Sequence, residues 1–158
     1  MIHLTITTEI VNIKKLNILG IPCKGLTNMG EKVGNAVKEL MEHVKDVKTW
    51  NGKPWFGVFQ PCPEEVENEE LIYFVCIETE GSIVQGNYPG GLQQITIPEQ
   101  RYMVIHKGKD DSIKDVYSGL NNFLIERNEV QNSESHCYIL EFPVDELWES
   151  IQVYVPIK

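Results

Sequence analysis

The sequence predicts an α+β fold, a tandem βαββ repeat with pseudo-two-fold symmetry in which two helices lie on antiparallel sheets around a central groove. Three observations support this. Two segments have the apolar spacing of amphipathic helices, the segments around them alternate like strands, and both halves of the chain have the same element order. With 158 residues, of which 42% are hydrophobic, the chain is long and apolar enough to form one domain with a full core.

Strand-like segments lie on both sides of the first predicted helix. The segment 16–23 is apolar although Gly20 and Pro22 interrupt it, and residues 2–6 are a further, weaker candidate. After the helix, two short segments rich in aromatic and β-branched residues have the composition of strands. We expect these strands at 55–60 and 71–78.

The first helix is predicted from residue 29 onward, because apolar residues recur there on one helical face. They are Val33, Val37, Leu40, Met41, Val44 and Val47. Asn28 and Glu31 have the spacing of a capping box, so we expect the Asn28 side chain to accept a first-turn amide.

The second half of the chain has the same pattern. Strands are expected at 102–106, 138–142 and 151–157. Between the first two of these, polar residues that can cap a helix precede a second apolar stripe. The cap candidates are Asp110, Asp111 and Ser112, and the stripe is Ile113, Val116, Tyr117, Leu120, Phe123 and Leu124.

A glycine-rich segment, residues 81–91, divides the chain into halves of about 1–80 and 92–158. The halves align with nearly constant spacing, and Ile72 and Ile151 are equivalent at an offset of 79. A βαββ unit covers only one face of its sheet with its helix, so two such units leave uncovered faces that can meet around a groove. The repeat therefore predicts a cleft.

Charge and motif content argue against several functions. The net charge of −9 opposes direct binding to nucleic acid or to anionic membranes. The sequence has no long apolar segment and no signal-peptide pattern, so we expect a cytoplasmic protein without a membrane span. Its four cysteines and four histidines show no metal-ligand spacing, and no phosphate-binding glycine loop or nucleophile elbow is present. We expect no metal and no cofactor.

Several short motifs in the second half resemble a known family. They are Ile97-Pro98, the strand 102–105 running into His106-Lys107-Gly108, an inward-facing Tyr117 on the helix, and the closing Val153-Tyr154-Val155-Pro156-Ile157-Lys158. In this order they resemble the GyrI-like effector-binding domain, found in AraC-type and MerR-type regulators and as a stand-alone protein. The resemblance implies a groove that binds hydrophobic, often cationic, small molecules. It also implies a sensor without a DNA-binding module, because the two halves together occupy the sequence and leave no room for a helix-turn-helix.

One position departs from the family pattern. Many members have a buried glutamate just before the closing Val-Tyr-Val-Pro-Ile pattern, where this sequence has Gln152. A buried carboxylate selects cations because an unpaired charge is costly to bury, whereas an amide only forms hydrogen bonds. Gln152 therefore leaves the preference for cations open, unless Glu141 supplies the charge.

Strand alternation selects the residues that face the groove. On the last strand the aliphatic residues suit the helix side, which leaves Gln152 and Tyr154 for the groove. The repeat then places Ile72, Phe74 and Cys76 under the first helix, and Tyr73, Val75 and Ile77 in the groove. Trp55 and Phe59, on the strand before, and Glu141 are assigned to the groove by the same reasoning, and Trp148 is a candidate cap over it. The candidate ligand-binding residues are Trp55, Phe59, Tyr73, Glu141, Trp148, Gln152 and Tyr154. For each aromatic the alternative is an ordinary place in the core.

The leading hypothesis is a protein that binds hydrophobic, aromatic and in some cases cationic small molecules. One alternative, which also follows from the resemblance, is a hydrolase of strained, cyclopropane-bearing electrophiles, in which Trp55 positions the ligand and Glu141 activates water. Another is a protein-binding module such as a gyrase inhibitor. The sequence leaves open whether the chain forms a homodimer through an exposed strand edge.

Overall fold

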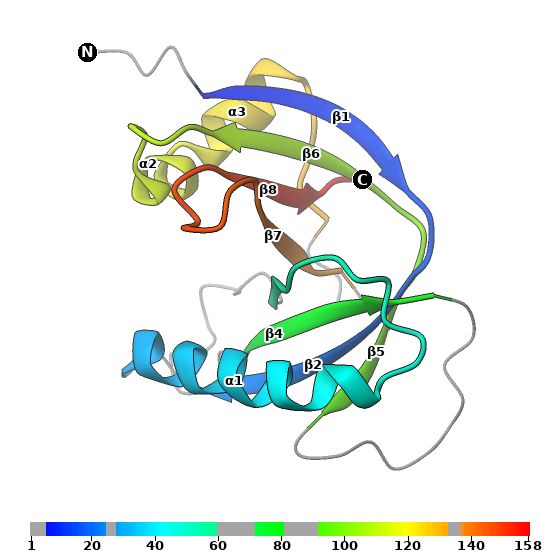
Figure 1. Ribbon diagram of the computed structural model, residues 1–158. Coiled ribbons are helices and arrows are strands. Elements are labelled where there is room, and N and C mark those ends of the chain that lie inside the picture. The colour runs from blue at the N-terminus through cyan, green and yellow to red at the C-terminus, as the bar shows by residue number, and fades with distance from the viewer. Residues whose placement is uncertain (1–5, 25–27, 60–71, 81–91, 133–136) are drawn as a thin grey trace.

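The computed structural model describes residues 6–24, 28–59, 72–80, 92–132 and 137–158 (Figure 1). Eight strands form one antiparallel sheet in the order β1-β6-β8-β7-β3-β4-β2-β5, which confirms the α+β prediction. The elements are β1 (Thr7–Ile13), β2 (Leu16–Lys24), α1 (Met29–His43), the 3₁₀ turn η1 (Val44–Asp46), β3 (Phe56–Phe59), β4 (Ile72–Thr79), β5 (Gln93–Ile97), β6 (Gln100–Lys107), α2 (Ile113–Ser118), α3 (Leu120–Glu126), β7 (Ile139–Pro143) and β8 (Ile151–Pro156).

The strand order is symmetric with respect to the two halves. If β1, β2, β3 and β4 exchange places with β5, β6, β7 and β8, respectively, the same strand order results, read from the other edge of the sheet. The halves meet in the middle, where β3 of the first pairs with β7 of the second. Each half thus contributes four strands, one more than the sequence predicts.

The additional strands are β1 and β5, at the two edges of the sheet. The expected strand at 2–6 lies mostly outside the described residues, and the observed one begins at Thr7. Both edge strands contain Thr, Gln, Glu or Asn at several positions and are largely exposed or half-buried. Their hydrophobic alternation is therefore weak, because one side of an edge strand borders water.

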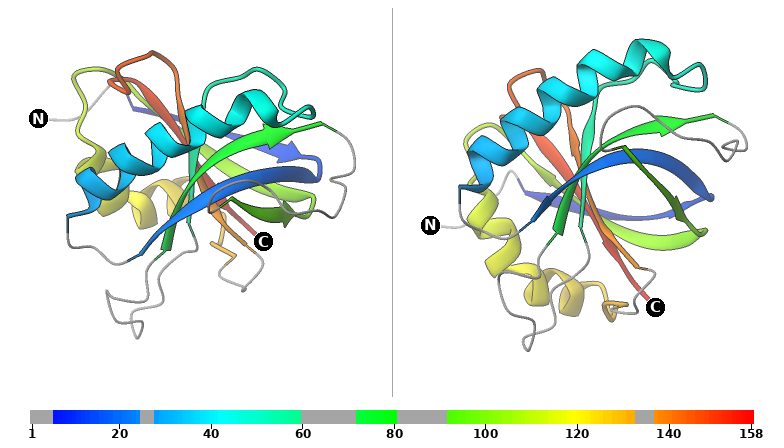
Figure 2. Two further views of the ribbon diagram at one scale, coloured as in Figure 1. Left: turned by 60° about the horizontal axis from the view of Figure 1, so that its bottom comes forward. Right: turned by 90° about the horizontal axis from the view of Figure 1, so that it is seen from below.

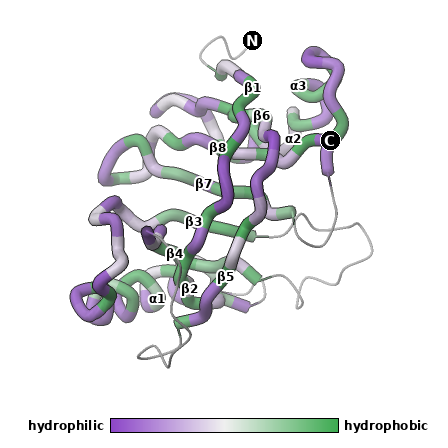
Figure 3. The backbone as a smooth tube through the Cα atoms, turned by 90° about the vertical axis from the view of Figure 1, so that its right-hand side faces the viewer, coloured by the Kyte–Doolittle hydropathy of each residue, from purple (hydrophilic) through white to green (hydrophobic). Residues whose placement is uncertain are grey.

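The edge strands form one long ribbon with their neighbours. β1 pairs with β6 and β2 pairs with β5, and the register continues from Ile13↔Gln100 to Leu16↔Ile97. Figure 3 shows the two bent segments of this ribbon running across the central strands. Side chains from the ribbon pack on the central strands in a shared core that includes Ile18, Phe56, Val58, Ile97, Tyr102 and Leu140.

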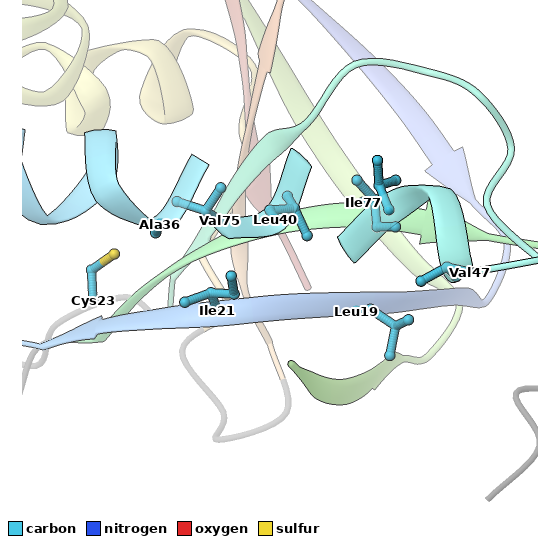
Figure 4. Close-up of a cluster of buried hydrophobic side chains, with 9 residues drawn as sticks. Leu19, Ile21, Cys23, Ala36, Leu40, Val47, Val75 and Ile77 are labelled. Carbon is cyan, nitrogen blue, oxygen red and sulfur yellow. The ribbon is translucent and has the colours of Figure 1, made fainter. Parts of the chain in front are cut away.

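The helices cover the other face of the sheet. α1 packs on β2 and β4, and α2 packs on β6 (Figure 2). Figure 4 shows the first of these cores, in which Leu40 of α1 meets Leu19 and Ile21 of β2 and Ile77 of β4. In the second core, Val116 and Leu124 pack on the aliphatic residues of β8, on the helix side as predicted.

Two local expectations are wrong. Asn28 occupies the N-cap position of α1 with φ 56°, in the left-handed region, and its side chain forms no cap hydrogen bond. The second predicted helix is divided at Gly119 into α2 and α3, while Ser112 caps α2 by accepting from the amide of Lys114. A short helix with an internal glycine has little to keep its two turns continuous.

The assignment of faces on β4 is also wrong. Val75 and Ile77 lie under α1, whereas Phe74 and Cys76 lie in the core on the opposite face. The reason is the repeat offset. Val75 and Val153 both lie on the helix-bearing face, which requires an offset of 78 rather than 79. A slip of one residue moves every side chain of a strand to the other face.

Candidate functional site

A carboxylate lies on the helix-bearing face at the junction of the two halves. Glu141 of β7 is paired directly with Gly57 of β3. The Tyr73 hydroxyl, from β4, donates a hydrogen bond to Glu141 Oε1 at 2.8 Å, and the Tyr117 hydroxyl, from α2, donates one to Oε2. Both halves of the chain therefore contribute to one site.

Both tyrosines remain protonated donors at neutral pH. Burial raises the pKa of the Tyr73 and Tyr117 hydroxyls, and the adjacent Glu141 carboxylate raises them further. An ionised carboxylate has about four lone-pair positions. Two donors leave acceptor capacity on Glu141 for a ligand.

Gly57 makes room for this arrangement. A Cβ atom at position 57 would lie 1.7 Å from the Tyr73 hydroxyl oxygen and 2.2 Å from its Cζ. The Tyr73 ring therefore crosses the backbone of β3 where no side chain blocks it. Only glycine at this position lets Tyr73 reach Glu141 across the intervening strand.

The ring of Phe59 lies beside both tyrosine donors. The ring of Phe59 lies 5.8 Å from that of Tyr73 and 6.2 Å from that of Tyr117, measured between centroids. Gly57, Phe59, Tyr73, Tyr117 and Glu141 are here called the Glu141 cluster.

Two tryptophans extend the aromatic surface. Trp55 lies two residues before Gly57 in sequence, and its ring stacks on that of Trp148 with centroids 4.4 Å apart. Together they line a cavity of about 490 Å³. Its other lining residues include Met41, Trp50, Pro54, Val144 and Glu146.

A rigid turn holds Trp148 in this place. Trp148 has φ 59°, which is unusual for a bulky residue. The carboxylate of Asp145 accepts hydrogen bonds from the amides of Leu147, Glu149 and Ser150, and these bonds lower the pKa of Asp145. The turn thus fixes the backbone that presents the indole to Trp55.

The structure divides the predicted site residues into two sets. Trp55, Phe59, Tyr73, Glu141 and Trp148 lie on the helix-bearing side. Gln152 and Tyr154 are on the opposite face, because they pair with Phe142 and Leu140, the neighbours of Glu141 along β7. The prediction of one groove containing all seven is therefore wrong. Glu141 therefore lies on the helix-bearing face and Gln152 on the opposite face.

The surroundings of Gln152 and Tyr154 differ accordingly. Gln152 Nε2 lies 3.3 Å from His106 Nδ1, and His106 Nε2 lies 3.0 Å from Glu9 Oε1. Tyr154 forms edge contacts with the rings of Phe142 and Tyr102.

Tyr117 is absent from the predicted site residues, although the sequence places it in the inward stripe of the second helix and among the motifs of the resemblance. The available signal was its hydroxyl, since a tyrosine in an otherwise apolar stripe needs a buried hydrogen-bond partner.

Other kinds of site find no support in the described part of the chain. No group of three or more His, Cys, Asp or Glu residues there could hold a metal ion. Among the same residues, no helix is long and apolar enough to cross a membrane.

Solved structures share the fold. The EcmrR–DNA complex superposes with a TM-score of 0.72 at 12% identity, covering 97% of this chain and 57% of EcmrR. SAV2435 bound to tetraphenylphosphonium gives 0.62 at 13% identity, covering 96% and 94% of the two chains. A hydrolase from Listeria innocua gives 0.67 at 10% identity, covering 96% and 91%.

These identities establish similarity of fold alone, and the chain spans little more than half the length of EcmrR. No curated protein matches the sequence significantly. The family model of the GyrI-like small molecule binding domain, however, matches residues 7–158. The chain therefore belongs to the family of GyrI-like small-molecule-binding domains.

Proposed function

We propose that this domain is an effector-binding protein whose ligands are hydrophobic aromatic molecules, with cations preferred, and that Glu141 provides the counter-charge. The observation that carries the proposal is the Glu141 cluster, a carboxylate that accepts from two tyrosine hydroxyls whose rings contact Phe59. Trp55 and Trp148 supply further ring surface on the same side of the sheet.

The chemistry of these residues favours a cation. A positive charge over an aromatic face gains about 0.5 to 2 kcal/mol, more when water is excluded. A carboxylate nearby adds a direct charge interaction that is strong in a partly dry site. SAV2435, which has the same fold, was solved with the organic cation tetraphenylphosphonium.

Calorimetric titration tests the proposal. Tetraphenylphosphonium should bind more tightly than triphenylphosphine oxide, which is neutral and retains three phenyl rings. Glu141→Gln should weaken binding of the cation by about tenfold or more and change binding of the oxide little. Glu42→Gln, on the exposed side of α1, is the matched control because it removes the same charge elsewhere. Equal affinity of wild type and Glu141→Gln for the cation would refute the role of Glu141.

A second candidate is hydrolysis of a strained ring. The observation that favours it is again Glu141, with acceptor capacity left and on the same face of the sheet as Trp55, together with the fold shared with the Listeria hydrolase. Glu141 would take a proton from water as the water oxygen bonds to a ring carbon and the strained C–C bond breaks, and Glu141 would then return that proton to the released carbon. Ring-opened product from a cyclopropane-bearing alkylator, lost in Glu141→Gln, would favour this activity over simple binding.

The effector role itself rests on family and fold. EcmrR, the neighbour with the same fold, was solved with DNA, and this chain corresponds to part of it. We propose that ligand binding here serves as a signal, as in a regulator's sensor domain. Ligand-dependent protection against proteolysis, without conversion of the ligand, is the expected behaviour of a sensor.

A further inference from the structure

A second cavity lies on the opposite face of the sheet from the Glu141 cluster. It has a volume of about 290 Å³, and its apolar lining includes the half-buried Phe142 and Tyr154 and the buried Phe56 and Leu140. We call it the opposite-face pocket. The Phe56 and Phe142 rings stack with centroids 4.6 Å apart, and the Tyr154 ring meets Phe142 edge-on at 5.0 Å.

The backbone of β7 separates this pocket from the proposed effector site. Leu140 and Phe142 line the pocket, while Glu141 between them points to the other face. Alternation along β7 places the pocket and the Glu141 cluster on opposite faces, whereas Pro54 and Pro143 line both the opposite-face pocket and the cavity of Trp55 and Trp148. A ligand in the opposite-face pocket therefore contacts none of the Glu141 cluster.

Charged groups of both signs line the opposite-face pocket. Glu78 and Lys53, whose side chains carry opposite charges, are both among its lining residues. The Glu78 side chain is held in place, because Asn51 Nδ2 donates to its Oε2 at 2.6 Å and the Asn51 amide donates to the Glu78 carbonyl at 3.2 Å. Asn51 Oδ1 also accepts from the Lys53 amide at 3.0 Å, which fixes the backbone that carries the lysine.

We propose that the opposite-face pocket binds a small aromatic molecule that carries both an ammonium group and a carboxylate, such as an aromatic amino acid. The half-buried rings of Phe142 and Tyr154 provide a surface for a flat aromatic group. Glu78 pairs with the ammonium group and Lys53 with the carboxylate of the ligand. The volume is at the lower end for ligand pockets, about 300 to 1,000 Å³, so the ligand is small.

Three ligands with one ring system separate these contributions. Tryptophan carries both charged groups, tryptamine lacks the carboxylate, and indole-3-propionate lacks the ammonium group. In calorimetric titrations tryptophan should bind tightest, by about tenfold over each of the others. No binding of tryptophan, or equal binding of all three, would overturn the proposal.

Two variants assign each charge. Glu78→Gln should weaken tryptophan and tryptamine about tenfold and leave indole-3-propionate unchanged, while Lys53→Met should weaken tryptophan and indole-3-propionate and leave tryptamine unchanged. Glu42→Gln and Lys48→Met are charge-matched controls at exposed positions. Thermal unfolding of each variant verifies that it is folded. If folded Glu78→Gln and Lys53→Met bind all three ligands like the controls, the assignment is wrong.

This proposal and the proposed effector site can fail separately. Tryptophan should bind equally well in the presence of a saturating concentration of the organic cation used against the Glu141 cluster. Displacement of tryptophan by that cation would show that both ligands bind at one site, and it would overturn the proposal of a separate opposite-face site.

Discussion

Replacement of Gly57 by alanine tests the geometry of the Glu141 cluster most directly. The added Cβ would lie 1.7 Å from the Tyr73 hydroxyl oxygen, far inside any contact that a real Cβ makes, and 2.2 Å from the ring carbon that carries it. An overlap of this size is too large for a shift of a few tenths of an ångström to relieve. Tyr73 must rotate away and lose its hydrogen bond to Glu141.

The free energy of unfolding should fall by about 2 to 4 kcal/mol. Loss of a hydrogen bond to a charged acceptor costs about 1.5 to 3 kcal/mol. Crowding of a packed site costs about 1 to 3 kcal/mol. The smaller entropy of the unfolded alanine chain returns about 0.4 to 1 kcal/mol.

Urea unfolding measures the change, and two comparisons make it specific. Gly34→Ala, on the exposed side of α1 with no atom within 4 Å of the added Cβ, should stabilise the protein by up to about 1 kcal/mol. With Tyr73→Leu already present, Gly57→Ala should cost clearly less, because the ring it displaces is gone. If Gly57→Ala is as stable as wild type, Tyr73 does not cross β3 at this point and the site as described is wrong.

Three further predictions concern the surroundings of the cluster. Tyr117→Phe should lower the free energy of unfolding by about 1.5 to 3 kcal/mol, because Glu141 Oε2 loses its donor; an unchanged urea midpoint would contradict that bond. Trp148→Gly should be more stable than Trp148→Ala by about 1 kcal/mol, because a positive φ is sterically unfavourable for alanine but not for glycine. Equal thermal midpoints of the two variants would contradict this prediction. Asp145 has a lowered pKa in the folded state, so its stabilisation is present above about pH 3.9 and is lost as the pH falls through the folded pKa. Asp145→Asn should therefore reduce the loss of stability on acidification below pH 4. An unaltered acid-unfolding profile would argue against the hydrogen bonds from the backbone amides to the Asp145 carboxylate.

The sequence predicts the parts of the fold that have strong periodicity. α1 and the central strands alternate clearly because one face of each packs in a core. β1 and β5 were missed because they lie at edges, where polar residues are tolerated. The division of the second helix at Gly119 depends on packing that no short window of sequence contains.

The candidate site was predicted in part, for a related reason. Composition indicates that Glu141, Tyr73 and Trp55 are unusual among strand residues, and the repeat places their strands together. Which face each side chain takes depends on the exact offset between the halves, and an error of one residue reverses it. The role of Tyr117 and the need for glycine at position 57 follow only from the tertiary structure, since their partner Glu141 is distant in sequence.

The same alternation explains how a small domain can present two chemically different surfaces. Along β7, Glu141 points toward the helices while Leu140 and Phe142 point toward the ribbon. The helix-bearing side gathers a carboxylate, tyrosine hydroxyls and tryptophans, which suits a hydrophobic cation. The other side has a pocket lined by aromatic residues together with Glu78 and Lys53, which suits a ligand with both charges. Because a substitution at one β7 position changes only one face, Glu141→Gln should affect the cation and leave tryptophan binding intact, and Lys53→Met should do the reverse. If either variant weakened both ligands, the two faces would not act as separate sites.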